Sequence, residues 1–101
     1  MSIKYELFWL LSSIPKGKVT TYKILAEYFH TSPRAIASML SANRELDRYP
    51  CYKVIASNGK ISGYRGWIEN KIIRLESDGV KIQDKKIDLS LFLWLPEWEK
   101  A

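Results

Sequence analysis

The sequence predicts a small α+β domain that is mainly α-helical, and three observations carry this prediction. The chain has 101 residues, 47% of them hydrophobic, which suits one domain with its own core. Its first half repeats apolar residues at helical spacing between turns that contain Pro, Gly, Ser and Thr. Its second half has short apolar runs around Asn58-Gly59, a dipeptide typical of β-hairpins. We therefore expect a single domain over residues 1–101.

Three helices are expected in the first half. Ser2 can cap the first, whose apolar residues fall at positions 3, 7, 10 and 11, and the Pro-Gly turn at 14–18 ends it. Thr20 or Thr21 can cap a second helix that reaches position 29. Ser32, followed by a proline, can cap a third helix that ends near Asn43.

The second and third of these helices, with the short turn at 30–32, have the spacing of a helix-turn-helix. Ala26 is small enough to let the two helices approach, and Ile36 is expected as the buried anchor of the third helix. Any hairpin of two helices shares most of these signals, so the pattern alone is moderately specific.

A β-hairpin and a fourth helix are expected in the second half. The apolar segments 54–56 and 60–61 flank the Asn-Gly turn. Residues 68–77 have helical spacing, and Gly79 follows them as a C-terminal cap. Residues 80–87 are a candidate β segment and 89–95 a candidate strand or helix. With the hairpin as its wing, the predicted architecture is a winged helix-turn-helix.

The net charge of +5 lies mainly in the first half of the chain. Residues 14–53 carry seven Lys or Arg and three acidic residues, whereas residues 54–101 carry eight basic and seven acidic ones. Such a distribution is expected when one face meets a polyanion, although a solvated basic surface is an equal alternative.

Several classes of site and location have little support in the sequence. One Cys and one His cannot form a Cys/His metal site, so no metal is expected. The apolar stretches are too short to cross a bilayer, and the N-terminus does not resemble a signal peptide. We expect an intracellular, cytoplasmic protein in a reducing compartment.

Cys51 is the one cysteine, in the segment Tyr49-Pro50-Cys51-Tyr52-Lys53. It is a buried small hydrophobe, a surface residue without a role, or a nucleophile. Pro50 restricts the backbone before it, and Lys53 adds positive charge nearby. Free cysteines are more often buried than reactive, so this segment by itself favours a structural role.

Five separated motifs together resemble a known family. They are Ile14-Pro15-Lys16-Gly17-Lys18-Val19-Thr20-Thr21-Tyr22, Arg34-Ala35-Ile36-Ala37 with Asn43, Pro50-Cys51-Tyr52-Lys53-Val54, Asn58-Gly59 with Gly63-Tyr64, and residues 75–80. In this order and spacing they resemble the C-terminal DNA-binding and active-site domain of O6-alkylguanine-DNA alkyltransferases, also called methylated-DNA–protein-cysteine methyltransferases, and of the related alkyltransferase-like proteins. The resemblance covers about residues 5–82. It implies a winged helix-turn-helix without the family's usual N-terminal domain.

The resemblance implies how the chain would meet duplex DNA. The third helix would lie in the minor groove, Arg34 would replace a flipped base in the stack, and Tyr22 would press on the adjacent phosphate. Basic side chains would add attraction to phosphates. The DNA-contacting residues expected are Tyr22, Arg34, Thr20, Ala35, Ser38, Lys16, Lys18 and Lys53, with Lys23 and Arg44 as further cations.

In the implied active site, Cys51 accepts the alkyl group from guanine O6 and keeps it as a thioether. The protein would therefore act once, without a cofactor. Asn43 would hydrogen-bond the active-site loop to the helix-turn-helix. The pocket for the flipped base would be lined by Tyr64, Arg65, Gly63, Val54 and Leu46.

Two positions depart from the family pattern. Tyr52 stands where the family has a histidine that receives the thiol proton through water, and Asp78 stands where a glutamate orients that histidine. An ordinary thiol has a pKa of about 8.5, and a tyrosine, with a pKa near 10, is a poor proton acceptor at neutral pH. Transfer by Cys51 is therefore expected to be slower than in the family.

Three functions remain open. The first is a repair protein that transfers the alkyl group to Cys51. The second is a lesion-binding protein that flips alkylated guanine without transfer and recruits other repair factors. The third is a winged-helix transcriptional regulator that reads a sequence in the major groove. In the first two functions the partner is duplex DNA that contains alkylated guanine. We expect the protein to bind it as a monomer, and we expect no membrane as a partner.

Overall fold

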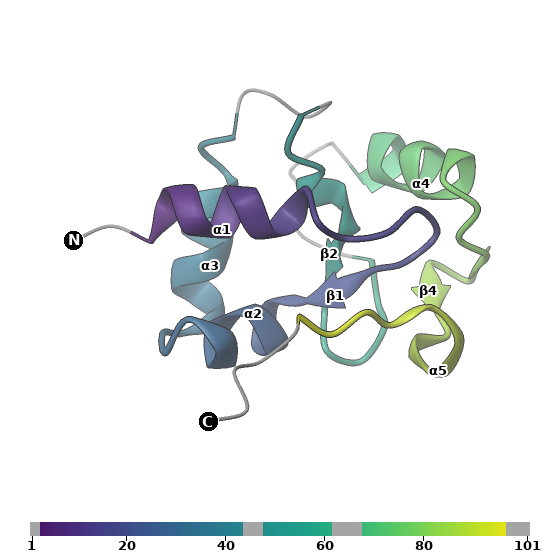
Figure 1. Ribbon diagram of the computed structural model, residues 1–101. Coiled ribbons are helices and arrows are strands. Elements are labelled where there is room, and N and C mark those ends of the chain that lie inside the picture. The colour runs from purple at the N-terminus through teal and green to yellow at the C-terminus, as the bar shows by residue number, and fades with distance from the viewer. Residues whose placement is uncertain (1–2, 44–47, 62–67, 97–101) are drawn as a thin grey trace.

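The computed structural model describes residues 3–43, 48–61 and 68–96, which form short helices around two very small sheets (Figure 1). The elements are α1 (Lys4–Leu11), β1 (Thr20–Thr21), α2 (Tyr22–Tyr28), α3 (Pro33–Leu40), the 3-10 helix η1 (Cys51–Lys53), β2 (Val54–Ile55), α4 (Ile68–Ser77), β3 (Ile82–Gln83), β4 (Lys86–Ile87) and α5 (Leu89–Phe92). The predicted class, α+β and mainly α, is therefore confirmed.

The helix-turn-helix is built from α2 and α3, as predicted. The Thr21 hydroxyl caps α2 by accepting from the Ile24 N–H at 3.1 Å, and the Ser32 hydroxyl caps α3 by accepting from the Ala35 N–H at 3.1 Å. Ala26 and Ile36 are both buried in one cluster. The third helix ends at Leu40, three residues before the predicted end, and a turn carries the chain on to Asn43.

The first helix begins without a side-chain cap. Ile3 occupies the N-cap position of α1, and Ser2, predicted as the cap, lies outside the described residues. The turn after α1 contains Gly17 at φ +80°, a backbone conformation that favours glycine.

Of the hairpin predicted around Asn58-Gly59, the structure has the turn, closed by the Ala56 N–H donating to the Lys60 carbonyl at 3.1 Å, and the described residues show no strand ladder between 54–56 and 60–61. The strand before the turn, β2, pairs in parallel with β1, with Thr20 opposite Val54 and Thr21 opposite Ile55. Gly59 is needed for another reason: it has φ +87°, and a Cβ there would lie 2.6 Å from the Ile87 carbonyl oxygen. The Asn-Gly signal therefore marks a turn packed against β4, without a two-stranded ladder of its own.

An antiparallel hairpin does form later, from β3 and β4. Its two turn residues, Asp84 and Lys85, have φ of 53° and 57°, as a type I′ turn requires. Neither is glycine, so the sequence signal for this hairpin is weak. The helix α4 has the predicted bounds, and Gly79 follows it with φ +94°.

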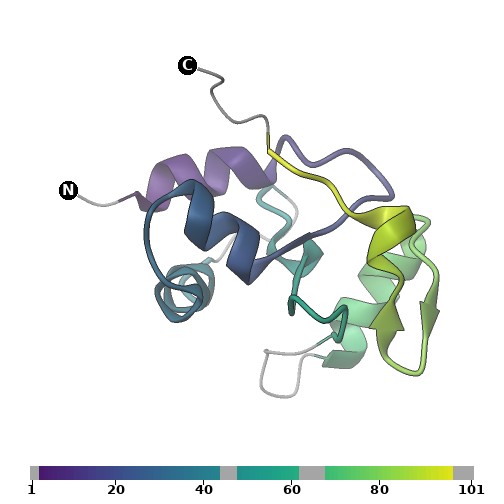
Figure 2. The same cartoon turned by 90° about the horizontal axis from the view of Figure 1, so that it is seen from below.

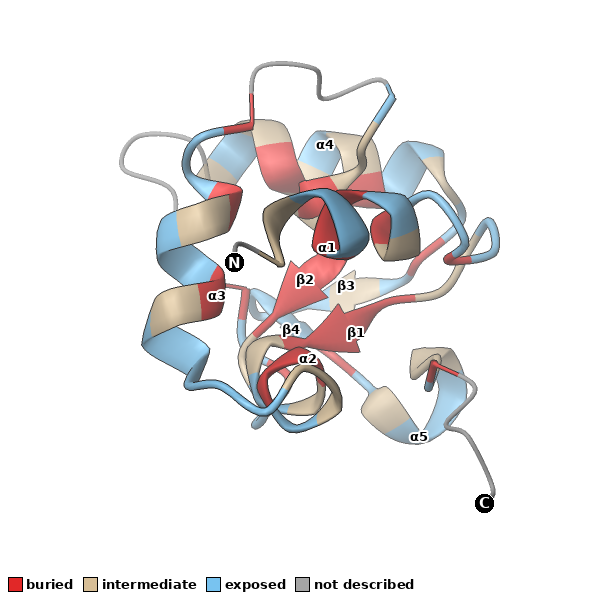
Figure 3. Ribbon diagram, turned by 60° about the vertical axis from the view of Figure 1, so that its left-hand side comes forward, coloured by how far each residue is buried: buried red, intermediate tan, exposed pale blue. Residues whose placement is uncertain are grey.

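Two buried clusters meet at the β1–β2 pair (Figure 3). Val54 belongs to the first, with residues of α1, α2 and α3, and Ile55 belongs to the second, with Leu75, Val80 and Ile87. Adjacent residues of a strand point to opposite faces, which explains this division. The parallel pair thus joins the helix-turn-helix to the C-terminal half.

The segment after β4 packs against the same pair. Leu89–Phe92 is a short helix, and the Val19 N–H donates to the Phe92 carbonyl at 2.8 Å while the Trp94 N–H donates to the Val19 carbonyl at 2.7 Å. Trp94 packs on the first cluster. Within the described part of the chain, no helix is both long enough and apolar enough to cross a membrane.

Candidate nucleic-acid interface and active site

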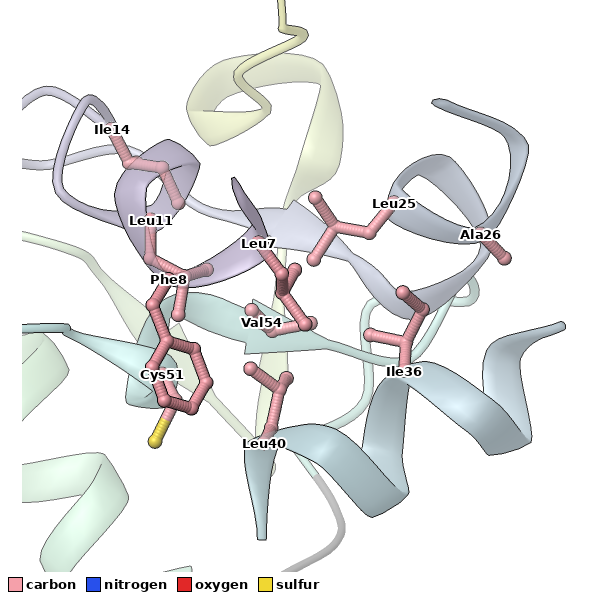
Figure 4. Close-up of a cluster of buried hydrophobic side chains, with 10 residues drawn as sticks. All are labelled: Leu7, Phe8, Leu11, Ile14, Leu25, Ala26, Ile36, Leu40, Cys51 and Val54. Atoms are coloured by element: carbon pink, nitrogen blue, oxygen red, sulfur yellow. The ribbon is translucent and has the colours of Figure 1, made fainter. Parts of the chain in front are cut away.

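Cys51 is the first residue of η1, at the bend between Pro50 and β2. Its N–H donates to the Tyr49 carbonyl at 2.8 Å, and its side chain is only 1% exposed. It belongs to the first buried cluster, and Figure 4 shows its sulfur directed away from the aliphatic side chains there. The thiol is therefore held in a defined, water-poor place beside the core.

Asn43 ties this segment to the helix-turn-helix. Its side-chain amide donates to the Tyr49 carbonyl at 2.7 Å, and Asn43 itself is buried just after α3. The same Tyr49 carbonyl accepts from the Cys51 N–H, so one oxygen joins α3 to the thiol-bearing helix. The contact expected of Asn43 is thus present.

Lys53 and Asp78 form a buried ion pair beneath η1. The Lys53 Nζ lies 2.9 Å from Asp78 Oδ2, with 5% of the lysine side chain exposed. The ammonium also donates to the Ile14 and Pro15 carbonyls, at 3.4 and 3.0 Å, and the same carboxylate accepts from the Gly17 N–H at 2.6 Å. Lys53 was expected to contact DNA, and its burial in this pair corrects that prediction.

Asp78 and Tyr52, which stand in the places of the family's glutamate and histidine, have different partners. Within the described residues, the Asp78 carboxylate is directed to Lys53 and Gly17. The Tyr52 ring instead packs on the second cluster and lies under the Arg74 guanidinium, 5.7 Å from its centroid. Within the described residues, the carboxylate of Asp78 is thus held by Lys53 and Gly17, and the ring of Tyr52 lies by Arg74.

Lys71 is a buried cation that the sequence analysis did not single out. It is 1% exposed, and its Nζ donates to the Val54 carbonyl at 2.7 Å and lies 5.7 Å from the Tyr22 ring centroid. Its signal was present in the sequence: positions 68, 71, 72 and 75 fall on one face of α4, so the lysine occupies the apolar face.

Burial and the nearby Cys51 change the titration of two groups here. Desolvation lowers the pKa of Lys71 to about 8, with the Cys51 charge acting in the opposite direction. Desolvation, assisted by the Cys51 charge, raises the pKa of Tyr22 to about 12. Tyr22 thus stays a neutral hydrogen-bond donor at physiological pH, whereas Lys71 has an appreciable fraction of free amine.

The outer surface of α3 carries the expected groove-facing residues. Arg34 and Ser38 are exposed, four residues apart and so on one side of the helix, and Ala35 is partly exposed beside them. Tyr22, at the start of α2, is partly buried. Arg34 and Ser38 thus share one side of α3, whereas Tyr22 packs against the first cluster and lies beside Lys71.

Three other residues expected at DNA do not share this surface. Thr20 is fully buried in β1, and its hydroxyl has no hydrogen-bond partner among the described residues. Lys16 is exposed, and Lys18 donates from Nζ to the Leu91 carbonyl at 3.1 Å. Their turn lies at the opposite end of the molecule from α3 (Figures 1 and 2). The basic excess of the first half is therefore divided between two ends.

Part of the expected pocket lies outside the described residues. This applies to Leu46, Gly63, Tyr64, Arg65 and the cation Arg44. Val54, the remaining pocket residue, is fully buried in the first cluster. Among the described residues no three His, Cys, Asp or Glu side chains gather where they could hold a metal ion.

A hollow of about 690 Å³ lies away from Cys51, between the β3–β4 hairpin and α5. Its lining includes Lys81, Asp84, Lys86 and Asp88 together with apolar residues of α5. Since Cys51 does not line it, this hollow offers no access to the thiol.

Comparison with known proteins gives one consistent family. The model of the DNA-binding domain of 6-O-methylguanine DNA methyltransferase matches residues 3–80. The chain is 44% identical over 88 residues to a bifunctional methyltransferase/endonuclease of Picrophilus torridus, covering 85% of this chain and 30% of that protein. It is also 44% identical over 81 residues to a methylated-DNA–protein-cysteine methyltransferase of Saccharolobus islandicus, covering 80% of this chain and 53% of that protein. The chain thus spans 30% of the first relative's length and about half of the second's.

Solved structures agree with the sequence comparison. S. pombe Atl1, in complex with damaged DNA containing O6-carboxymethylguanine, superposes with a TM-score of 0.83 at 27% identity, covering 93% of this chain and 95% of that one. The O6-methylguanine-DNA methyltransferase of Pyrococcus kodakaraensis superposes with a TM-score of 0.70 at 34% identity, covering 79% and 47%. The Mycobacterium tuberculosis OGT in complex with DNA gives 0.69 at 28% identity, covering 77% and 50%.

Proposed function

The chain belongs to the family of 6-O-methylguanine DNA methyltransferase DNA-binding domains, and from this premise we propose that it removes alkyl groups from guanine O6 in duplex DNA by transfer to Cys51. The observation that carries the proposal is the hydrogen-bonded link between the helix-turn-helix and the segment that holds the thiol. Asn43, three residues after α3, and Cys51, in η1, both donate to the Tyr49 carbonyl. A helix seated on DNA would therefore hold the thiol at a fixed position relative to the duplex.

DNA is engaged by the outer surface of α3, which enters the minor groove. Arg34 projects from the first turn of this helix and is exposed, as a side chain that enters a base stack must be. Its planar guanidinium can stack on the neighbouring bases and hydrogen-bond the partner of the flipped base. Extruding a base costs a few kcal/mol, which this filling of the gap offsets.

Tyr22 acts on the same nucleotide from the start of α2. Its ring is partly buried beside Lys71, and its pKa, raised to about 12, keeps the hydroxyl protonated. A neutral phenol can press on a phosphate without charge repulsion and can donate a hydrogen bond.

Transfer then proceeds by attack of the Cys51 sulfur on the alkyl carbon. The carbon–oxygen bond to guanine breaks as the carbon–sulfur bond forms, and a thioether remains on the protein. Nothing in this step returns the thiol, so each molecule acts once.

A direct test compares binding to two duplexes that differ only in one O6-methylguanine, using fluorescence anisotropy with Cys51→Ser so that transfer cannot occur. We expect tighter binding to the lesion, by on the order of tenfold, since a damaged base is less costly to extrude. Equal affinities for both duplexes, together with a preference for one unmodified sequence, would instead indicate a winged-helix transcriptional regulator.

A second candidate function is lesion binding without transfer. Two observations favour it: a tyrosine, Tyr52, follows Cys51 where the family has the relay histidine, and the chain superposes on nearly the whole of S. pombe Atl1, whose structure was solved with damaged DNA. The candidates differ in the fate of the base. Under lesion binding, O6-methylguanine recovered from the complex is unchanged, whereas transfer leaves guanine.

A further inference from the structure

We propose that the buried Lys53–Asp78 ion pair positions the thiol for transfer: it holds η1, and Cys51 with it, against the turn that leads to Tyr22. This role rests on the proposed transfer to Cys51 and names the residues that fix where the sulfur stands relative to the extruded nucleotide. Lys53 and Asp78 act through the backbone of η1 and are therefore positioning residues.

The thiol and the lysine belong to one turn of helix. Cys51 and Lys53 are the first and last residues of η1. The Lys53 N–H donates to the Pro50 carbonyl at 3.1 Å, and the Val54 N–H donates to the Cys51 carbonyl. Each of these hydrogen bonds spans three residues, as in any 3-10 helix, so a displacement of Lys53 moves Cys51 as well.

The Lys53 side chain is fixed in direction as well as in charge. Its Nζ lies 2.9 Å from Asp78 Oδ2 and donates to the Ile14 and Pro15 carbonyls at 3.4 and 3.0 Å. An ammonium has three N–H donors, which these three oxygens match. The carboxylate also accepts from the Gly17 N–H at 2.6 Å. With only 5% of the lysine side chain exposed, η1 is thus anchored to the 14–18 turn.

This turn leads directly to a residue that the proposed function places at the DNA. Residue 19 follows the turn, then β1, and then Tyr22 as the first residue of α2. The Asn43 amide holds the segment before η1 through the Tyr49 carbonyl, whereas Lys53 holds the last residue of η1. The thiol-bearing turn is therefore fastened on one side to the helix-turn-helix and on the other to the segment that ends at Tyr22.

Position and stability can be separated at such a pair. Replacing a buried ion pair with apolar residues of similar volume is often neutral for stability. Hydrogen bonds to fixed carbonyls define one place for the ammonium, whereas a methionine has several rotamers in the same space. A misplacement of about 1 Å at a reacting group can slow a reaction by roughly a hundredfold. An apolar pair can therefore keep the fold and still lose the placement of the thiol.

The experiment uses the full chain with Lys53→Met and Asp78→Leu combined, so that no buried charge is left unpaired. Three quantities are measured: the stability to urea, the affinity for an O6-methylguanine duplex in a Cys51→Ser background, and the single-turnover rate constant for methyl transfer at saturating duplex. We expect stability and affinity close to those of the natural chain, and a rate constant lower by about tenfold or more.

Two further variants are measured beside the double variant. Lys53→Arg keeps a cation with several N–H donors, so its rate constant should stay close to the natural one. Lys81→Met removes an exposed lysine and should match the natural chain in all three measurements. A double variant that transfers at the natural rate on saturating duplex overturns the positioning role. If the double variant does not fold, Asp78→Asn takes its place, with the same expectation and the same overturning result.

A measurement without DNA separates this role from the proposed function. Amide hydrogen exchange, followed by NMR, reports opening of η1 at the N–H groups of Lys53 and Val54, which close its turn. In the double variant we expect these amides to exchange about tenfold faster, while the Ile36 N–H of α3 exchanges as before.

The two measurements fail in different ways. If the natural chain transfers no methyl group but η1 opens more often in the double variant, the transfer proposal fails and the pair still holds η1 in place. If exchange at Lys53 and Val54 is unchanged in the double variant, the positioning role is overturned whether or not transfer is observed.

Discussion

Cys51, Tyr52 and Asp78 show how much of the site depends on single residues. The spacing of the motifs in the sequence predicts that Cys51 stands at the family's cysteine position. It also shows that tyrosine has replaced the relay histidine. What replaces the relay is not readable there, because it depends on which side chains share a buried space. Asp78 is directed to Lys53, and Tyr52 packs under Arg74. Each of these contacts joins residues more than twenty positions apart, so the spacing of the motifs does not show them.

At Arg34, replacement by alanine should weaken binding to a lesion duplex by on the order of tenfold, and binding to an intact duplex much less. The reason is that the guanidinium fills the gap left by an extruded base, a contact that intact DNA does not offer. Fluorescence anisotropy on both duplexes measures the difference. Lys16→Ala serves as control, since it removes an exposed cation in the 14–18 turn, and this turn lies far from α3 (Figure 1). If Arg34→Ala lowers the affinity for the two duplexes equally, Arg34 is only a phosphate contact.

At the scale of elements, the helices were easier to predict than the strands. Cap residues and apolar spacing locate α3 and α4 within a few residues, since both signals are local. The pairing of β2 with β1 joins segments thirty-four residues apart, and no local signal indicates it. The Asn-Gly dipeptide favoured a hairpin at 54–61, whereas Gly59 is explained by its contact with Ile87.

The Lys53–Asp78 pair joins three elements, and its removal should be costly. Asp78→Ala leaves the buried Lys53 ammonium without its carboxylate and the Gly17 N–H without its acceptor. We expect a loss of about 3–5 kcal/mol in the free energy of unfolding, measured by urea denaturation. Glu76→Ala, which removes an exposed carboxylate within α4, is the control.

A double variant separates ion pairing from packing. Lys53→Met with Asp78→Leu removes both charges together, and it should recover most of the stability lost in Asp78→Ala because no buried charge is left uncompensated. If Asp78→Ala alone costs less than about 1 kcal/mol, the pair is not a structural link between η1, the 14–18 turn and α4.

At the scale of the whole molecule, the β1–β2 pair divides the core into a half that contains the helix-turn-helix and a C-terminal half. Asn43, Cys51 and Val54 lie with the helix-turn-helix, and Lys71 reaches them from the other half. The two ends of the basic region lie far apart, so the charge count over 14–53 overstated the positive face. Sequence position alone could not show this, because neighbouring turns of a chain can end on opposite sides of a fold.

The segment 89–96 completes the C-terminal half, and its removal should destabilise the fold. Truncation after Asp88 takes away both backbone partners of Val19 and the packing of Phe92 and Trp94. We expect a fall in Tm of roughly 10 °C or more, since about 1 kcal/mol corresponds to 4–8 °C in a domain of this size. Truncation after Pro96 keeps these contacts and is the control. An unchanged Tm on removal of residues 89–101 would refute a role for this segment in the core.

The central claim is that Cys51 accepts the alkyl group, and intact-mass spectrometry tests it most directly. The protein is incubated with excess duplex that contains O6-methylguanine, beside Cys51→Ser as a matched control. We expect the natural chain to gain the mass of one methyl group, located at Cys51 by peptide mapping, and Cys51→Ser to gain none. A natural chain that binds the lesion duplex but keeps its original mass through long incubation would contradict the claim and leave lesion binding without transfer as its function.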